Sequence, residues 1–252
     1  MLRFGAIATA SWIPLSLGAL WVGLTTSGAV DPLFLPPPTK VWREGSRLFS
    51  MGELQAAIGQ TLVVMAAGYS LGSFGGVLAG LAMGGSQFVR ASLDPLISAL
   101  LATPKLSLLP LLMLLLGLGA APRLSLVALT CFLVTALAAL DAVRGISQGY
   151  VDLARNYGAG RLEIFTNVLA PAALPVIFTG LRLAAGRALA MTIAVELVSG
   201  EKGVGGLIWV AWQSYSTDRL FVGLFTAAGL GMLLHLLLRR LEKKAVPWQA
   251  EA

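Results

Sequence analysis

Charged side chains are scarce in this chain. Only 12% of its 252 residues are Asp, Glu, Lys or Arg, whereas 57% are hydrophobic, and the mean hydropathy is +0.82. A soluble globular domain carries about 25% charged residues. The composition therefore excludes an ordinary soluble domain and indicates a membrane protein.

The signatures of several catalytic and cofactor-binding sites are also missing. The sequence has no Gly-x-x-x-x-Gly-Lys-[Ser/Thr] phosphate loop and no His-Glu-x-x-His motif, and it has one histidine and one cysteine. We therefore expect no ATP binding through a phosphate loop, no metal site, no intrachain disulfide and no nucleic-acid partner. An intramembrane enzyme would need a nucleophile and a base within the membrane, and the sequence offers no convincing pair. We predict that Cys131 and His235 are packed residues of two apolar segments.

Long apolar runs fill most of the sequence. A bilayer core of roughly 30 Å requires about 20 apolar residues in a helix. The runs are continuous rather than alternating, which is typical of membrane helices and not of transmembrane barrels. We predict an all-α integral membrane protein with about six transmembrane helices, in residues 4–30, 54–89, 106–122, 124–140, 174–198 and 220–238.

The Lys and Arg residues of the predicted loops favour a cytoplasmic N-terminus, which carries Arg3. With six spans, this orientation places residues 149–171 and the tail 241–252 in the cytoplasm. Residues 1–30 then form the first transmembrane helix, residues 31–58 an external loop, and residues 59–240 the core. Within the external loop, residues 39–49 predict an amphipathic helix at the outer surface, with Val41, Trp42, Leu48 and Phe49 opposite Lys40, Arg43, Glu44 and Arg47.

A polar segment at residues 149–171 interrupts the apolar pattern. It contains Asp152, Ala154 and Gly158, and after nine further residues it continues with Val168 and Pro171. It predicts a short helix at the membrane surface that offers an apolar knob to a partner. Gly158 would allow the chain to turn, and Pro171 would begin the next helix. The charge pattern alone is equally compatible with an ordinary amphipathic connector between two membrane helices.

The spacing of Asp152, Gly158 and Pro171 resembles the EAA loop of bacterial ABC-importer permeases, whose pattern is Glu-Ala-Ala, three residues, Gly, nine residues and Ile-x-Leu-Pro. Leu153 and Ala170 depart from that pattern. Further motifs between residues 35 and 238 are similar to the nitrate, sulfonate and taurine branch of these permeases. They are Gly52-Glu53-Leu54, Leu93-Asp94-Pro95-Leu96, Thr103-Pro104-Lys105-Leu106, Gly117-Leu118-Gly119, Thr179-Gly180-Leu181-Arg182-Leu183 and Gly203-Val204-Gly205-Gly206-Leu207-Ile208.

The resemblance implies a type I ABC importer permease-like fold in a bacterial inner membrane. It implies a permease subunit that moves a small anion such as a sulfonate, taurine or nitrate, without a cofactor of its own. The implied partners are a second permease copy, two cytoplasmic ATPase subunits that bind ATP-Mg, and a periplasmic or lipid-anchored solute-binding protein. The implied contacts with the ATPase are Asp152, Ala154, Arg155, Tyr157, Gly158, Arg161, Phe165 and Pro171. The alternative is a self-contained membrane transporter or an intramembrane enzyme that is not coupled to an ATPase.

Ionisable residues inside the predicted spans indicate a candidate translocation pathway. If the third span runs from about residue 95 to residue 117, Lys105 lies near its middle, beside Pro104 and before Pro110. Two prolines there would open the helix, which is tolerated only where the segment is buried in protein or lines water. Lys105 is equally well explained as a side chain that snorkels from a span beginning at residue 106. Arg182 and Glu196 share one face of the fifth predicted span but lie about 21 Å apart along it, so each needs a partner elsewhere.

Glycines recur at every fourth residue of the second predicted span. Residues 72, 76, 80 and 84 are all Gly and line one face of a helix. Such a face permits close backbone contact with another helix. The pattern is compatible with packing inside one chain and with packing between two copies.

Overall fold

The computed structural model describes residues 2–249, without the side chains of residues 2–11, 14, 161 and 249. The side chains of Arg3 and Arg161, and residues 250–252 of the predicted tail, therefore lie outside the described residues. Every regular element of the described range is helical, as predicted. The longer helices are α1 (Leu2–Thr26), α2 (Pro38–Ser50), α3 (Glu53–Gly85), α4 (Gln87–Ala102), α6 (Ala120–Arg144), α9 (Ala170–Ser199), α10 (Val204–Gln213) and α11 (Thr217–Ala245). The short ones are η1 (Lys105–Leu108), α5 (Leu109–Leu116), α7 (Gln148–Asn156), α8 (Arg161–Ile164), the π-helical turn η2 (Phe165–Leu169) and η3 (Pro247–Gln249).

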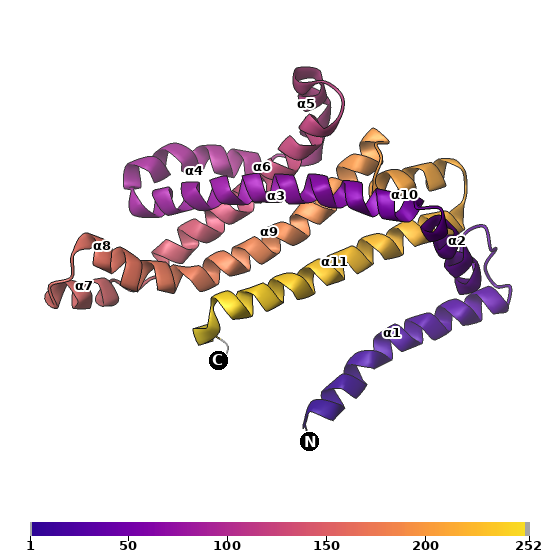
Figure 1. The fold of residues 1–252 in the computed structure, drawn as a ribbon, viewed down its shortest axis with the longest axis horizontal. Helices are drawn as coiled ribbons and strands as arrows, with labels where there is room; N and C mark the ends of the chain where they lie inside the picture. Colours follow the sequence, from indigo (N-terminus) through magenta and orange to yellow (C-terminus); the bar gives the residue numbers. More distant parts are fainter. Residues whose placement is uncertain (1, 250–252) are drawn as a thin grey trace.

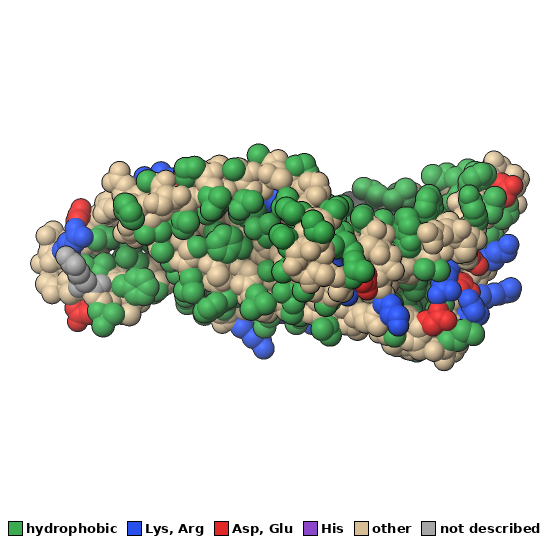
Figure 2. All heavy atoms as spheres, turned by 90° about the horizontal axis from the view of Figure 1, so that it is seen from above, with side chains coloured by type: hydrophobic (Ala, Val, Ile, Leu, Met, Phe, Trp, Pro, Cys, Tyr) green, Lys and Arg blue, Asp and Glu red, His purple; other side chains and the backbone are tan. Residues whose placement is uncertain are grey.

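Four helical stretches of the described chain are long and apolar enough to cross a membrane: α3, α6, the stretch Leu162–Gln213 that contains α9, and α11. They form an elongated bundle, with α7 and α8 at one end and α2 and α10 at the other (Figure 1). Helix α1 has 25 residues, and its part Leu15–Thr26 is a shorter apolar helix. Apolar side chains are spread over the whole visible face, and charged side chains gather mainly near its two ends (Figure 2).

The third predicted span is not a continuous helix. Helix α4 ends at Ala102, and the chain turns by 95° before the helical stretch Lys105–Leu116. The break lies at Pro104, and the preceding Thr103 is extended, as the ring of a following proline favours. The segment is thus a broken span or a re-entrant loop, and with it the described chain has up to five candidate spans. The prediction of one uninterrupted third span, over residues 106–122 or 95–117, is therefore wrong. The prediction that prolines open the helix is confirmed at Pro104 but not at Pro110, which lies in the first turn of α5.

The glycine face of α3 packs against α6 of the same chain. A Cβ added to Gly72, Gly76 or Gly80 would collide with backbone atoms of α6, and one added to Gly84 would collide with Val143. These glycines therefore allow the two backbones to approach closely within one bundle. Next to this contact, Cys131 is fully buried in a cluster of α3, α6 and α9 side chains, as predicted for a packed thiol.

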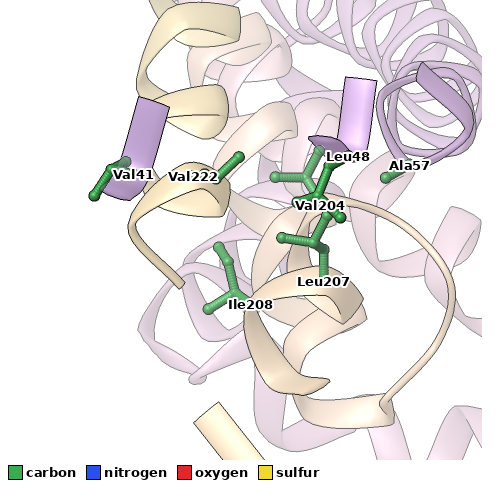
Figure 3. Close-up of a cluster of buried hydrophobic side chains, with 7 residues drawn as sticks. All are labelled: Val41, Leu48, Ala57, Val204, Leu207, Ile208 and Val222. Atoms are coloured by element: carbon green, nitrogen blue, oxygen red, sulfur yellow. The ribbon is translucent and has the colours of Figure 1, made fainter. Parts of the chain in front are cut away.

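Helix α2 lies where the amphipathic helix was predicted, but only part of its predicted apolar face is buried. Val41 and Leu48 are buried in a cluster with side chains of α3, α10 and α11 (Figure 3). Trp42 and Phe49 remain 77% and 61% exposed. One edge of α2 thus closes this end of the bundle, while the aromatic side chains stay outside it.

Candidate functional site

The polar segment 149–171 folds into two short helices joined by a turn. Helix α7 ends at Asn156, and Gly158 has a φ of +84°, which favours glycine over residues with a Cβ. The backbone N–H of Ala159 donates to the carbonyl of Ala154 at 3.0 Å and closes the turn. The N–H of Gly160 donates to the Glu163 carboxylate at 2.8 Å at the start of α8. The predicted turn at Gly158 is confirmed, but the segment contains two short helices rather than one.

Large side chains of this segment are exposed at the end of the bundle. Tyr157 is 86% exposed, and Tyr150, Leu153, Leu162 and Phe165 are between 51% and 74% exposed. Contiguous exposed apolar side chains are typical of a protein contact surface. We call these five side chains the knob of the α7–α8 segment.

A cavity of about 630 Å³ lies beside the knob. It brings together three of the predicted coupling residues, Ala154, Tyr157 and Pro171, with Trp248 of the C-terminal segment. Pro171 is in the first turn of α9, as predicted. Asp152 and Arg155 face each other as an exposed pair at 3.5 Å, a geometry that contributes little stability. Trp248 was not predicted, because its place beside α7 depends on how the chain returns after α11.

Lys105 is the first residue of η1 and follows Pro104 at the break after α4, while Pro110 lies in the first turn of α5. Its ammonium donates to the carbonyl of Leu101 at 3.2 Å, a group that the end of α4 leaves without a helical partner. The side chain also lines a cavity of about 390 Å³ with residues of α6 and α9, among them Arg187. The structure thus gives Lys105 a capping contact and a place on a cavity wall.

Arg182 and Glu196, which share a face of α9, have separate partners. A guanidinium nitrogen of Arg182 lies 2.7 Å from a carboxylate oxygen of Glu242 on α11. Arg182 also lines a cavity of about 460 Å³ with Arg187 and His235. The prediction that His235 is a packed side chain is therefore wrong, because His235 is exposed on α11 and lines this cavity.

Glu196 is fully buried where α9, α3 and α10 meet. Its carboxylate accepts hydrogen bonds from the Thr61 hydroxyl at 2.8 and 3.0 Å and from the Gly205 N–H at 3.0 Å. Thr61 in turn accepts a hydrogen bond from the N–H of Val204 at 2.9 Å. A Cβ at Gly203 or Gly205 would collide with Glu196, so these glycines let α10 sit directly on the end of α9. Its contacts within the described chain are structural, and a pathway role for Glu196 stays a prediction.

No cluster of three or more His, Cys, Asp or Glu side chains in the described part of the chain could hold a metal ion. The two cavities on α9 are instead lined by cations and uncharged residues. A cavity lined by charges of one sign attracts ligands of the opposite charge.

Comparisons with known proteins relate the chain to membrane transport. Residues 72–246 match the model of the family described as "Binding-protein-dependent transport system inner membrane component". The taurine transport system permease protein TauC of Escherichia coli is 33% identical over 95% of this chain and 91% of its own length. The putative aliphatic sulfonates transport permease protein SsuC of Bacillus subtilis is 29% identical over 94% of this chain and 86% of its own length.

Two solved structures share the fold. A chain of the inward-facing MetNI methionine ABC transporter superposes with a TM-score of 0.66 and 18% identity, over 78% of this chain and 97% of that chain. A chain of an amino acid ABC transporter has a TM-score of 0.64 and 17% identity, over 80% and 96%. The predicted permease fold is confirmed, and the comparisons favour an ABC importer permease over a self-contained transporter or an intramembrane enzyme.

Proposed function

Because the chain belongs to the family of binding-protein-dependent transport system inner membrane components, the permease subunits of ABC importers, we propose that it carries a small anion across a bacterial inner membrane. Taurine and sulfonates are in the names of two similar permeases, and both carry a sulfonate group. The cationic walls of the α9 cavities support an anion as the cargo.

The observation that carries the proposed energy coupling is the exposed knob of the α7–α8 segment. We assign ATP hydrolysis to two cytoplasmic partner subunits, because the sequence has no phosphate loop. The knob, with Tyr157 at 86% exposure, would insert into a surface of the ATPase and become buried there. This contact would include the predicted residues Asp152, Ala154, Arg155, Gly158, Arg161, Phe165 and Pro171.

The segment is well connected to the membrane bundle. Helix α8 continues through the turn η2 into α9 without an intervening loop. A displacement of α8 by the ATPase would therefore move α9 as a rigid element. Two permease copies, rocked in this way, would expose a site between them first to the outside and then to the cytoplasm.

The opposite end of the bundle would receive the solute-binding protein. Helix α2 with its exposed Trp42 and Phe49 lies at that end, beside the ion pair of Arg219 with Glu53 at 2.5 Å. Aromatic and charged side chains are the residues that a protein partner commonly contacts. The external segment 31–58 is accordingly assigned to binding-protein contact.

Reconstitution tests the proposed function. The chain is purified with the ATPase subunits and binding protein encoded by neighbouring genes and placed in liposomes. We expect uptake of labelled taurine or nitrate that requires both ATP and the binding protein. Uptake that persists without ATP, or ATP-driven uptake of cationic solutes alone, would contradict the proposal.

A further inference from the structure

Arg187 lies near the middle of α9, and the proposed function gives it no role so far. It is the eighteenth of 30 residues in that helix, about 26 Å from the end at Ala170. Its side chain is exposed in the single chain. Among the described residues it has no hydrogen bond and no ion pair, in contrast to Arg182 with Glu242.

Such a side chain cannot face lipid at low cost. Charged residues at the middle of a span face the interior of a bundle, a partner or water. Arg187 lines both cavities on α9, the one with Arg182 and His235 and the one with Lys105. It therefore stands where the two cavities adjoin along one face of the helix.

The cavity shared by Lys105 and Arg187 has the size and charge of a site for a small anion. Its volume of about 390 Å³ is within the usual range of small-molecule sites. Its lining contains two cations and no carboxylate, and it is otherwise formed by Leu101, Leu106, Thr130, Val134, Ala190, Met191 and Ala194. The charge of the two side chains is therefore not neutralised within the cavity.

Donor groups remain available on both side chains. The Lys105 ammonium has three protons, of which one is used by the Leu101 carbonyl. The planar guanidinium of Arg187 suits two oxygens of a sulfonate, nitrate or similar oxyanion. The Thr130 hydroxyl donates to the Leu126 carbonyl at 2.8 Å within its own helix, so it offers no proton to a ligand.

We infer that Lys105 and Arg187 together form an oxyanion-binding site on the translocation pathway, with Arg187 as the principal anchor and Lys105 as the second cation. The inference deepens the proposed function and depends on it for the identity of the cargo. The inference also gives the break in the third span a role, because the turn at Pro104 places Lys105 on the same cavity as residues of α9.

The local charge at this site is measurable without knowledge of the cargo. Ala190 is exposed and lines both cavities, one helical turn from Arg187. A cysteine is introduced by Ala190→Cys in a Cys131→Ala background, in the complex with its ATPase subunits in lipid nanodiscs. The probes are a negatively charged sulfonatoethyl and a positively charged trimethylammonium-ethyl methanethiosulfonate, and the ratio of their reaction rates is normalised to that for 2-mercaptoethanol.

We expect the normalised ratio to favour the anionic reagent by about tenfold or more, because a cleft lined by one sign of charge concentrates the opposite charge. Replacing both cations, by Lys105→Gln and Arg187→Gln, should abolish this preference. Arg90→Gln is the matched control, because Arg90 of α4 lines neither cavity. A preference unchanged in the double variant, or no reaction with either reagent with or without ATP, would overturn the site.

A second variant covers the case in which the double variant fails to assemble. Met191→Glu keeps both cations and adds a carboxylate four residues from Arg187, on the same wall of the cavity. It should lower the preference for the anionic reagent at least threefold. An unchanged preference would also count against the site.

Uptake separates this inference from the proposed function. In the reconstituted importer, Arg187→Gln should lower anion uptake at least tenfold, and Arg187→Lys should restore part of it. If the importer moves no anion but the labelling prefers the anionic reagent, the proposed cargo is wrong and the site stands. If anion uptake is normal in the double variant, the site is wrong and the proposed function stands.

Discussion

At the scale of single residues, Thr61 shows how a buried carboxylate is held in this bundle. Its hydroxyl donates to Glu196 and accepts from the N–H of Val204, so one side chain of α3 joins α9 to α10. Burial of Glu196 would be costly without these hydrogen bonds. The sequence predicted that Glu196 needs a partner, but Thr61 lies 135 residues away, and no local pattern identifies it.

Thr61→Ala should therefore destabilise the bundle by roughly 1–3 kcal/mol, because it leaves one carboxylate oxygen of Glu196 and the N–H of Val204 buried without a partner. Thermal unfolding in detergent measures the effect. Thr226→Ala is the control, since the Thr226 hydroxyl bonds only to the carbonyl of Val222 within its own helix. Equal losses in the two variants would show that the shared hydrogen bonds contribute nothing.

Gly158 is the residue at which local conformation and the proposed coupling meet. A β-branched residue at a φ of +84° is strained, so Gly158→Val should reorient α8 relative to α7. We expect transport to fall at least tenfold, with membrane insertion retained. Gly158→Asn, which tolerates this conformation better, should recover part of the activity.

The matched control in the same segment is Gly149→Ala, because a Cβ there meets only the Ser147 hydroxyl at an ordinary distance of 3.5 Å. Transport and ATP hydrolysis are both measured in proteoliposomes. Normal transport by Gly158→Val would remove the coupling role of this turn.

At the scale of elements, the contact of α3 with α6 rests on the absence of side chains. Gly76→Leu should prevent the close approach, because a side chain there would enter the space of Phe132 and Thr135. We expect a loss of several kcal/mol in stability or a failure to fold, measured as the yield of monodisperse protein in detergent. Gly59→Leu is the control on the same helix, where an added Cβ meets nothing within 4 Å. An equal yield from both variants would contradict the packing argument.

The helices show which elements could be predicted from the apolar pattern of the sequence and which could not. The long runs of α3, α6 and α11 are continuous in the sequence and are single helices in the structure. The third predicted span failed because length and apolarity do not encode a 95° turn, even though Pro104 and Pro110 signal a local opening. Likewise, the sequence pattern predicted that Trp42 and Val41 share the apolar face of α2. Only tertiary packing decides that Val41 is buried and Trp42 is not.

At the scale of the whole molecule, the proposed function requires a definite topology. The α7–α8 segment must face the cytoplasm, and α2 must face the outside. Single cysteines at Lys40 and Arg161, in a Cys131→Ala background, should differ in their reaction with a membrane-impermeant maleimide on spheroplasts. We expect Lys40→Cys to be labelled at once and Arg161→Cys only after lysis.

Lysis serves as the control for reactivity, because both cysteines must be labelled once the membrane is open. Labelling of Arg161→Cys from outside would make contact with a cytoplasmic ATPase impossible.

The spacing of Asp152, Gly158 and Pro171 was sufficient to predict the family of this segment from sequence. The contribution of Trp248 to its surroundings was not predictable, because it arises from the return of the C-terminus to α7.

The close seat of α10 on the end of α9 has a mechanical consequence. Helix α9 has 30 residues and is about 45 Å long, and its Ser199 end is fixed by contacts that leave no room even for a methyl group at Gly203 or Gly205. If α9 tilts about this end together with the helices packed on it, a rotation of about 5° moves its opposite end by about 4 Å. Arg187, partway along α9, would move less than the α7–α8 segment. Two copies of α9 that face each other and tilt in this way would separate most at their Ala170 ends.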